Sequence, residues 1–126
     1  MKIFKFTVYV KPKPFVRPKF NSLNKCVFDD PGYSAFKTAV RFAAQKAMRT
    51  QNISVFSGNV SAEVKFFKNC KSVSSKSFGD IDNLLKALFD SFNNTVFFDD
   101  SQVVKVSAKK IADPCDRIEV KISEVI

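Results

Sequence analysis

The sequence predicts an α+β fold, a single domain over residues 1–126 in which two main helices pack on a mixed β-sheet. Apolar and polar residues alternate in four segments, as in half-buried strands, and apolar residues recur at helical spacing in two others. The expected order is β-α-β-α-(β)-β-β, where the bracketed strand is a short apolar run. A chain of 126 residues can enclose one hydrophobic core and is too short for two.

The first half of the chain contains a strand, a loop and a helix. Phe4, Phe6, Val8 and Val10 alternate with polar residues, and the prolines at 12 and 14 end this strand because proline lacks an amide donor. A basic loop is expected from Lys11 to Asp30. The following helix, from about Tyr33 to Arg49, has an apolar face made of Phe36, Val40, Phe42, Ala43 and Ala47.

The second half begins with a strand from about Gly58 to Phe67 and an exposed, serine-rich basic loop at 68–79. A second helix is predicted from about Asp82 to Asn93, with Ile81, Leu84, Leu85, Leu88 and Phe92 at helical spacing. Residues 95–98 form the short apolar run. The alternating segments 104–109 and 117–122, joined by a turn at Ala112-Asp113-Pro114, are predicted to pair as an antiparallel hairpin.

Composition excludes several kinds of chemistry. The chain has no histidine, which rules out histidine-dependent nucleophiles and imidazole metal sites, so acid-base or metal chemistry must use carboxylates, lysine or water. Its three cysteines are widely spaced and form no C-x-x-C pair, so we expect reduced thiols without a catalytic role. The sequence offers no membrane-spanning run and no signal peptide, which predicts a cytoplasmic protein.

Charge indicates a polyanionic partner. Lysine and arginine number 21 against 12 acidic residues, and residues 1–28 contain no acid at all. Five of the acids nevertheless lie within 21 residues: Asp80, Asp82, Asp90, Asp99 and Asp100. A divalent cation that bridges carboxylates to a phosphate would explain acids in a protein that binds a polyanion. The simpler alternative is that the positive charge only keeps a small protein soluble.

The spacing of the aspartates constrains the local structure. Residues two apart share a face in an extended chain but diverge by about 200° in a helix, so Asp80 should be extended and Asp82 should lie near the helix N-cap. Gly79 permits the bend. Each acid also has a purely structural interpretation, because aspartate favours N-caps and turns.

The stretch GDIDNLLKALFDSFNNTVFFDDSQVVKV resembles the signature of the RusA-type Holliday junction resolvases, D-x-D-N-x-x-K-x-x-x-D followed by D-D-x-Q-V. The matching positions are Asp80, Asp82, Asn83, Lys86, Asp90, Asp99, Asp100, Gln102 and Val103. The prolines and basic residues at 11–17 and the helical stretch after Asp30 are similar to the front of the same family.

This resemblance implies a homodimeric endonuclease, dependent on Mg²⁺ with Mn²⁺ as a possible substitute, that nicks four-way DNA junctions during recombination and repair. It implies no small-molecule cofactor. Asp80, Asp82 and Asp100 would hold the metal, Asp99 would be a weaker ligand, and Lys86 would neutralise charge at the scissile phosphate. Asp90 would be structural or would support the ligands from behind.

Basic residues around the cut would bind backbone phosphates without reading base sequence. The expected DNA-binding residues are Lys11, Lys13, Arg17, Lys19, Lys68, Lys71 and Lys76. Two other functions stay open at this point: a non-catalytic nucleic-acid-binding protein, and a metal-dependent nuclease that acts on forks, flaps or plain duplex.

Overall fold

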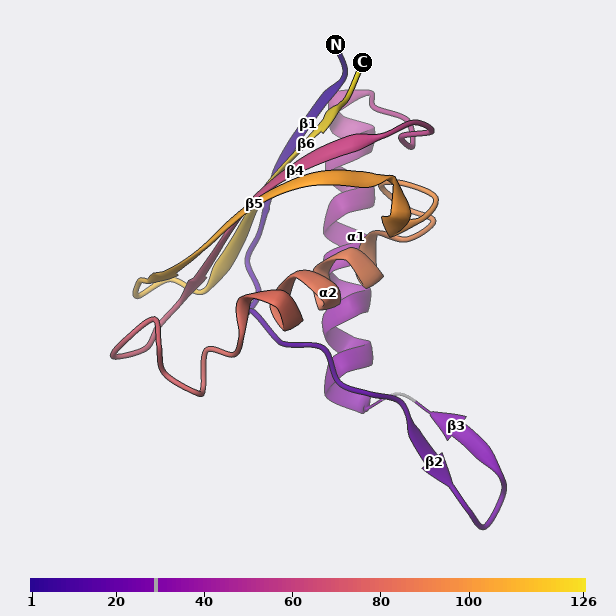
Figure 1. Cartoon of the computed structure of the whole chain (residues 1–126), viewed down its shortest axis with the longest axis vertical. Helices are drawn as coiled ribbons and strands as arrows, with labels where there is room; N and C mark the ends of the chain where they lie inside the picture. Colours follow the sequence, from indigo (N-terminus) through magenta and orange to yellow (C-terminus); the bar gives the residue numbers. More distant parts are fainter. Residues whose placement is uncertain (29) are drawn as a thin grey trace.

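Two helices cover one face of a four-stranded mixed sheet in the computed structural model, which describes residues 1–28 and 30–126 (Figure 1). The strand order in the sheet is β1-β6-β4-β5. The strands are β1 (Ile3–Val8), β4 (Val60–Lys68), β5 (Val103–Ala112) and β6 (Arg117–Glu124), and the helices are α1 (Pro31–Gln51) and α2 (Ile81–Phe92). The predicted α+β class is confirmed, and the bounds of the two predicted helices and of the four alternating strands fall within a few residues of the observed ones.

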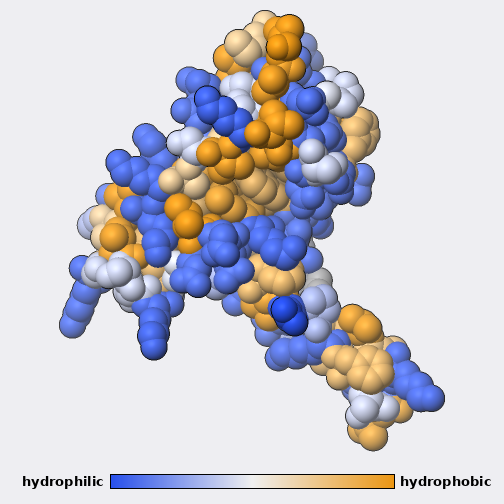
Figure 2. Space-filling model, viewed as in Figure 1, coloured by the Kyte–Doolittle hydropathy of each residue, from blue (hydrophilic) through white to orange (hydrophobic). Residues whose placement is uncertain are grey.

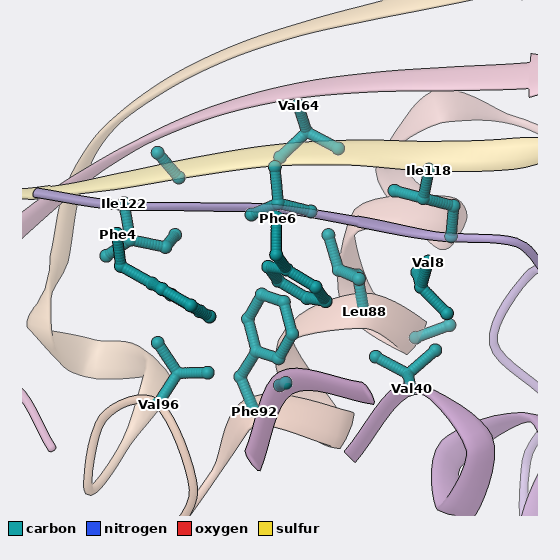
Figure 3. Packing of buried hydrophobic residues seen from close by; sticks show 14 of the residues in the cluster. Phe4, Phe6, Val8, Val40, Val64, Leu88, Phe92, Val96, Ile118 and Ile122 are labelled. Atoms are coloured by element: carbon teal, nitrogen blue, oxygen red, sulfur yellow. The ribbon is translucent and has the colours of Figure 1, made fainter. Parts of the chain in front are cut away.

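The core lies between the sheet and the two helices. In β1 the alternation places Phe4, Phe6 and Val8 inward, and β6 contributes Ile118 and Ile122 from the neighbouring strand. Figure 3 shows the rings of Phe4, Phe6 and Phe92 gathered beneath the strands. Phe4 stacks on Phe6 with ring centroids 4.9 Å apart, and Phe6 lies 5.9 Å from Phe92 of α2. This packing fixes α2 against the sheet.

The predicted hairpin between the last two strands is wrong. Both strands exist, but β4 lies between them, parallel to β5 and antiparallel to β6. The turn joining β5 to β6 crosses the end of β4, where Asp113 N donates to Lys68 O at 3.0 Å and Asn69 N donates to Asp116 Oδ1 at 2.7 Å. Alternation indicates that a strand has one buried face, but it does not identify its neighbours.

Three other expectations need correction. The predicted loop after β1 contains a separate two-stranded ribbon, β2 (Lys19–Asn21) and β3 (Cys26–Phe28). The apolar run at 95–98 is no strand, because only Phe97 forms isolated bridges, and the 3₁₀ turn η1 (Asp100–Gln102) follows it. Phe42, placed on the apolar face of the first helix, is 63% exposed, because the buried face runs through Ala44 and Met48.

Across residues 1–28 and 30–126, no helix is both long and apolar enough to span a bilayer.

Candidate active site

Asp80 occupies the N-cap of α2 with extended backbone, φ −78° and ψ 140°, which confirms the prediction. Gly79 supplies the bend with φ +93°, in the left-handed region that favours glycine. The carboxylate of Asp80 makes no capping hydrogen bond to the helix, although aspartate at this position ordinarily does so. Asp82 lies in the first turn of α2, two residues after the cap, in line with the prediction that it is near the N-cap.

The carboxylates of Asp80 and Asp82 are exposed and make no hydrogen bond or ion pair with the described residues. Lys86 follows Asp82 by one helical turn, so both lie on one side of α2. The Lys86 ammonium sits over the ring of Phe15, 4.6 Å from its centroid. Two free carboxylates and a lysine at the positive end of a helix can hold a cation and a phosphate together.

The second acidic pair has a different environment. Asp99 caps η1: its carboxylate accepts from Ser101 N at 3.0 Å, while its own amide donates to Gln102 Oε1 at 3.0 Å. Hydrogen bonds from Ser101 lower the pKa of the Asp99 carboxyl below its ordinary value. Asp100 begins η1, is exposed, and makes no side-chain hydrogen bond with the described residues. Asp99 is therefore structurally engaged, whereas Asp100 is free.

The two acidic pairs do not meet within one chain. Gly79 lies near the C-terminal end of β5, because Lys110 Nζ donates to Gly79 O at 2.8 Å. The turn η1 directly precedes the N-terminal end of the same strand (Figure 1). At about 3.3 Å per residue, the stretch of β5 from Gln102 to Lys110 spans roughly 25 Å. Among residues 1–28 and 30–126, no three acidic or thiol side chains lie close enough to share a metal ion. A single chain therefore keeps Asp80 and Asp82 apart from Asp100, and their shared metal site stays a prediction.

Other residues of the signature are structural. Asp90 accepts from the Tyr33 hydroxyl at 3.0 Å and so joins α2 to α1, in line with its expected supporting role. Gln102 had no predicted role, yet its Nε2 donates to the carbonyls of Phe56 and Gly58, each at 2.8 Å. These bonds hold the Asp99–Asp100 turn against the start of β4. A glutamine three residues after an N-cap aspartate is a capping-box signal, which could have revealed the bond between Asp99 N and Gln102 Oε1 but not those to Phe56 and Gly58.

A cleft of about 480 Å³ opens between residues 10–14, the start of α1 and the end of β4. Lys11, Lys13 and Lys68 line it, together with Ser77. Lys68 was expected in an exposed loop, but it is only 6% exposed at the end of β4, and its ammonium donates to Ser77 O. Burial and the nearby charge of Lys11 lower the pKa of Lys68.

The cleft adjoins the start of α2. A Cβ atom added to Gly79 would lie 3.4 Å from Pro14, and Phe15 N donates to Asn83 O at 3.0 Å. The cleft therefore opens close to Gly79, the residue before Asp80. The remaining predicted DNA-binding residues are exposed: Lys71 and Lys76 in the loop after β4, and Arg17 and Lys19 at the base of the β2–β3 ribbon.

Two comparisons with known proteins find similarities to this chain. The family model described as Endodeoxyribonuclease RusA matches residues 10–123. The uncharacterized protein YqaN of Bacillus subtilis (strain 168) is 32% identical over 142 aligned positions, which cover 99% of both chains. A protein of Lactococcus phage r1t named crossover junction endodeoxyribonuclease rusA is 47% identical over 47 residues, 36% of each chain. With a family match over nearly all of its length and the signature residues at the ends of α2 and β5, the chain belongs to the RusA endodeoxyribonuclease family.

Proposed function

We propose that this chain is a crossover junction endodeoxyribonuclease that uses Mg²⁺, with Mn²⁺ as a possible substitute, and acts as a homodimer in DNA recombination and repair. Its family and the name of the phage relative support this proposal. The observation that carries it is Asp80, an N-cap aspartate that leaves its helix uncapped and stands beside Asp82, Lys86 and the lysine cleft. Carboxylates kept free at a cost to helix stability indicate a ligand.

The residues of one chain supply part of a metal site. Asp80 and Asp82 offer two hard carboxylates, and a third would hold Mg²⁺ more firmly against a phosphate. A bound divalent ion would supply charge to the scissile phosphate and lower the pKa of an attacking water. Lys86 binds the scissile phosphate, while Lys11, Lys13 and Lys68 bind the backbone next to it.

A second subunit completes the site if two copies of β5 pair edge to edge. β5 ends the sheet, so one row of its backbone donors and acceptors has no partner strand. Val104 and Val106 are 55% and 43% exposed, and Figure 2 shows apolar side chains gathered in the region between β5 and α2. Burying such side chains and pairing the open edge would stabilise a dimer.

Antiparallel pairing of the two β5 strands brings the separated acids together. A twofold axis at the middle of β5 places the η1 end of one strand beside the Gly79 end of the other. Asp100 of the partner subunit then approaches Asp80 and Asp82. Each dimer gains two equivalent sites, which suits a substrate that must be nicked in two opposed strands.

Mixed dimers test this arrangement. Asp82→Asn and Asp100→Asn chains, each inactive alone, are unfolded and refolded together before nicking of a synthetic four-way junction is measured with Mg²⁺. Half of the dimers are then mixed, and each carries one intact site, so about a quarter of wild-type activity should return. A mixture of Asp82→Asn with Asp80→Asn is the matched control, because both changes damage the same end and no site is restored.

The outcomes separate the parts of the proposal. Absence of rescue with an active wild type would contradict the shared site while leaving the nuclease intact. A wild type that binds the junction but never nicks it, with either ion, would contradict the nuclease. Equal nicking of linear duplex, forks or flaps would contradict junction selectivity.

A further inference from the structure

The β2–β3 arm, residues Lys19–Phe28, is a two-stranded ribbon that belongs to neither layer of the fold. It projects beyond the start of α1, away from the four-stranded sheet (Figure 1). Phe20 pairs with Val27 across the two strands, and the intervening turn is shaped by the side chains of Asn21 and Asn24. An isolated hairpin is marginally stable in water, so an arm of this kind gains order from what it binds.

The arm exposes large apolar side chains to water. Phe20 is 63% exposed, Val27 69% and Leu23, in the turn, 95%. In Figure 2 the end of the projecting ribbon carries apolar surface. Apolar side chains left in water do not contribute the stabilisation that burial would give. Three of them on one short ribbon therefore indicate a contact surface.

The charge around the arm selects its occupant. Arg17 precedes its base and Lys25 lies in its turn, while Lys19 is 3.8 Å from Asp30 at the start of α1. The first 28 residues contain no acid. A second copy of the arm carries the same cations, so two arms would repel each other. DNA attracts the cations and offers apolar base faces to the side chains between them.

A four-way junction differs from linear duplex at the branch point, where base stacking is interrupted. An apolar side chain that enters a duplex must first unstack a base step, whereas the stacking is already broken where strands exchange. The arm can therefore bind the junction centre at a lower energetic cost than any position in a duplex. The geometry points to Leu23 as the residue that covers an exposed base face, with Phe20 and Val27 supporting it.

We propose that the β2–β3 arm recognises the branch point and makes the enzyme prefer junctions over duplex. This inference rests on the proposed function, whose nicking site is separate. Contacts of the cleft lysines with DNA phosphates give affinity for any DNA. The arm adds the affinity that depends on a branched DNA structure.

Fluorescence of 2-aminopurine tests the arm. The base is placed beside the branch point of a synthetic junction, and binding is compared with a linear duplex of equal length, using chains that all carry Asp82→Asn. The unaltered arm should change the fluorescence on the junction only. Leu23→Ser should abolish that change and reduce the junction-to-duplex affinity ratio by about 10-fold. The salt dependence of binding should stay unchanged, because no phosphate contact is lost.

Phe42→Ser is the matched control, since Phe42 is equally apolar, 63% exposed, and lies on α1. It should alter neither the fluorescence nor the affinity ratio. A Leu23→Ser chain that keeps both would overturn the inference, as would one that shifts from dimer to monomer in sedimentation, which would place the arm on the partner subunit. If the parent chain shows no preference for the junction, the proposed function fails together with the arm. If wild-type protein nicks junctions while Leu23→Ser keeps the preference, only the arm inference fails.

Discussion

Each of the two helices is preceded by an aspartate at its N-cap, and the two aspartates behave differently. Asp30 caps α1, since its carboxylate accepts from Tyr33 N at 3.1 Å, and it also lies 3.8 Å from Lys19. Asp80 occupies the same position on α2 and makes no such bond. The side chain of Asp80 therefore does not cap α2, although aspartate suits that role. The comparison teaches that an unused cap is a sign of a ligand site, whereas aspartate at an N-cap alone is not.

The largest effect should follow from Asp80→Asn. Replacing one carboxylate oxygen by an amide removes a charge from the proposed metal site, so the rate of junction nicking with Mg²⁺ should fall on the order of 100-fold or more. The thermal midpoint should change little because no cap is lost. Nicking assays and thermal unfolding on one preparation measure both. Retained nicking, or a large drop in midpoint, would make Asp80 a structural residue like Asp30.

Asp30→Ala should lower stability and leave nicking largely intact, the opposite of Asp80→Asn, and its effect in free energy should be smaller. Loss of the hydrogen bond to Tyr33 N should lower the free energy of unfolding by about 1 kcal/mol, as measured for other N-cap aspartates. The nicking rate at 25 °C should remain within a few fold of wild type, since α1 carries none of the signature acids. Chemical denaturation and nicking assays measure the two quantities. A nicking loss comparable to that of Asp80→Asn would erase the distinction between the helices.

The sequence predicted the helices and strands better than it predicted which strands lie side by side in the sheet. Periodicity located both helices and the main strands because it reports burial directly, and the spacing of Gly79, Asp80 and Asp82 correctly placed an extended residue before a helix. Strand order depends on which edges meet, and no pattern within one strand encodes that, so the hairpin was misplaced. The same limit affects the site. Residues 80 and 100 share a motif in sequence, but the length of α2 and β5 separates them in one chain.

The smallest expected effect concerns Lys68, a buried cation that can be compared with the free carboxylate of Asp80. Burial of its ammonium and the nearby charge of Lys11 both favour the neutral form and lower its pKa, although the ammonium also donates a hydrogen bond to Ser77 O. Lys68→Met keeps the apolar stem and removes the charge, so at pH 7 it should raise the free energy of unfolding by about 0.5 kcal/mol. The same variant should weaken DNA binding and reduce the log-log salt slope by about one unit.

The pH dependence follows from the direction of the pKa shift. Lys68 has a lower pKa in the folded chain than its ordinary 10.5, so between the two values the unfolded chain binds more protons and wild-type stability rises with pH. Lys68→Met lacks this gain, and its advantage over wild type should therefore shrink as pH approaches 10.5. Urea unfolding at pH 7 and pH 10 measures the difference. If the variant is less stable at both values, the ammonium is held for structure, as Asp30 is; if it is more stable but binds DNA less well, Lys68 joins Asp80 among the groups kept for a ligand.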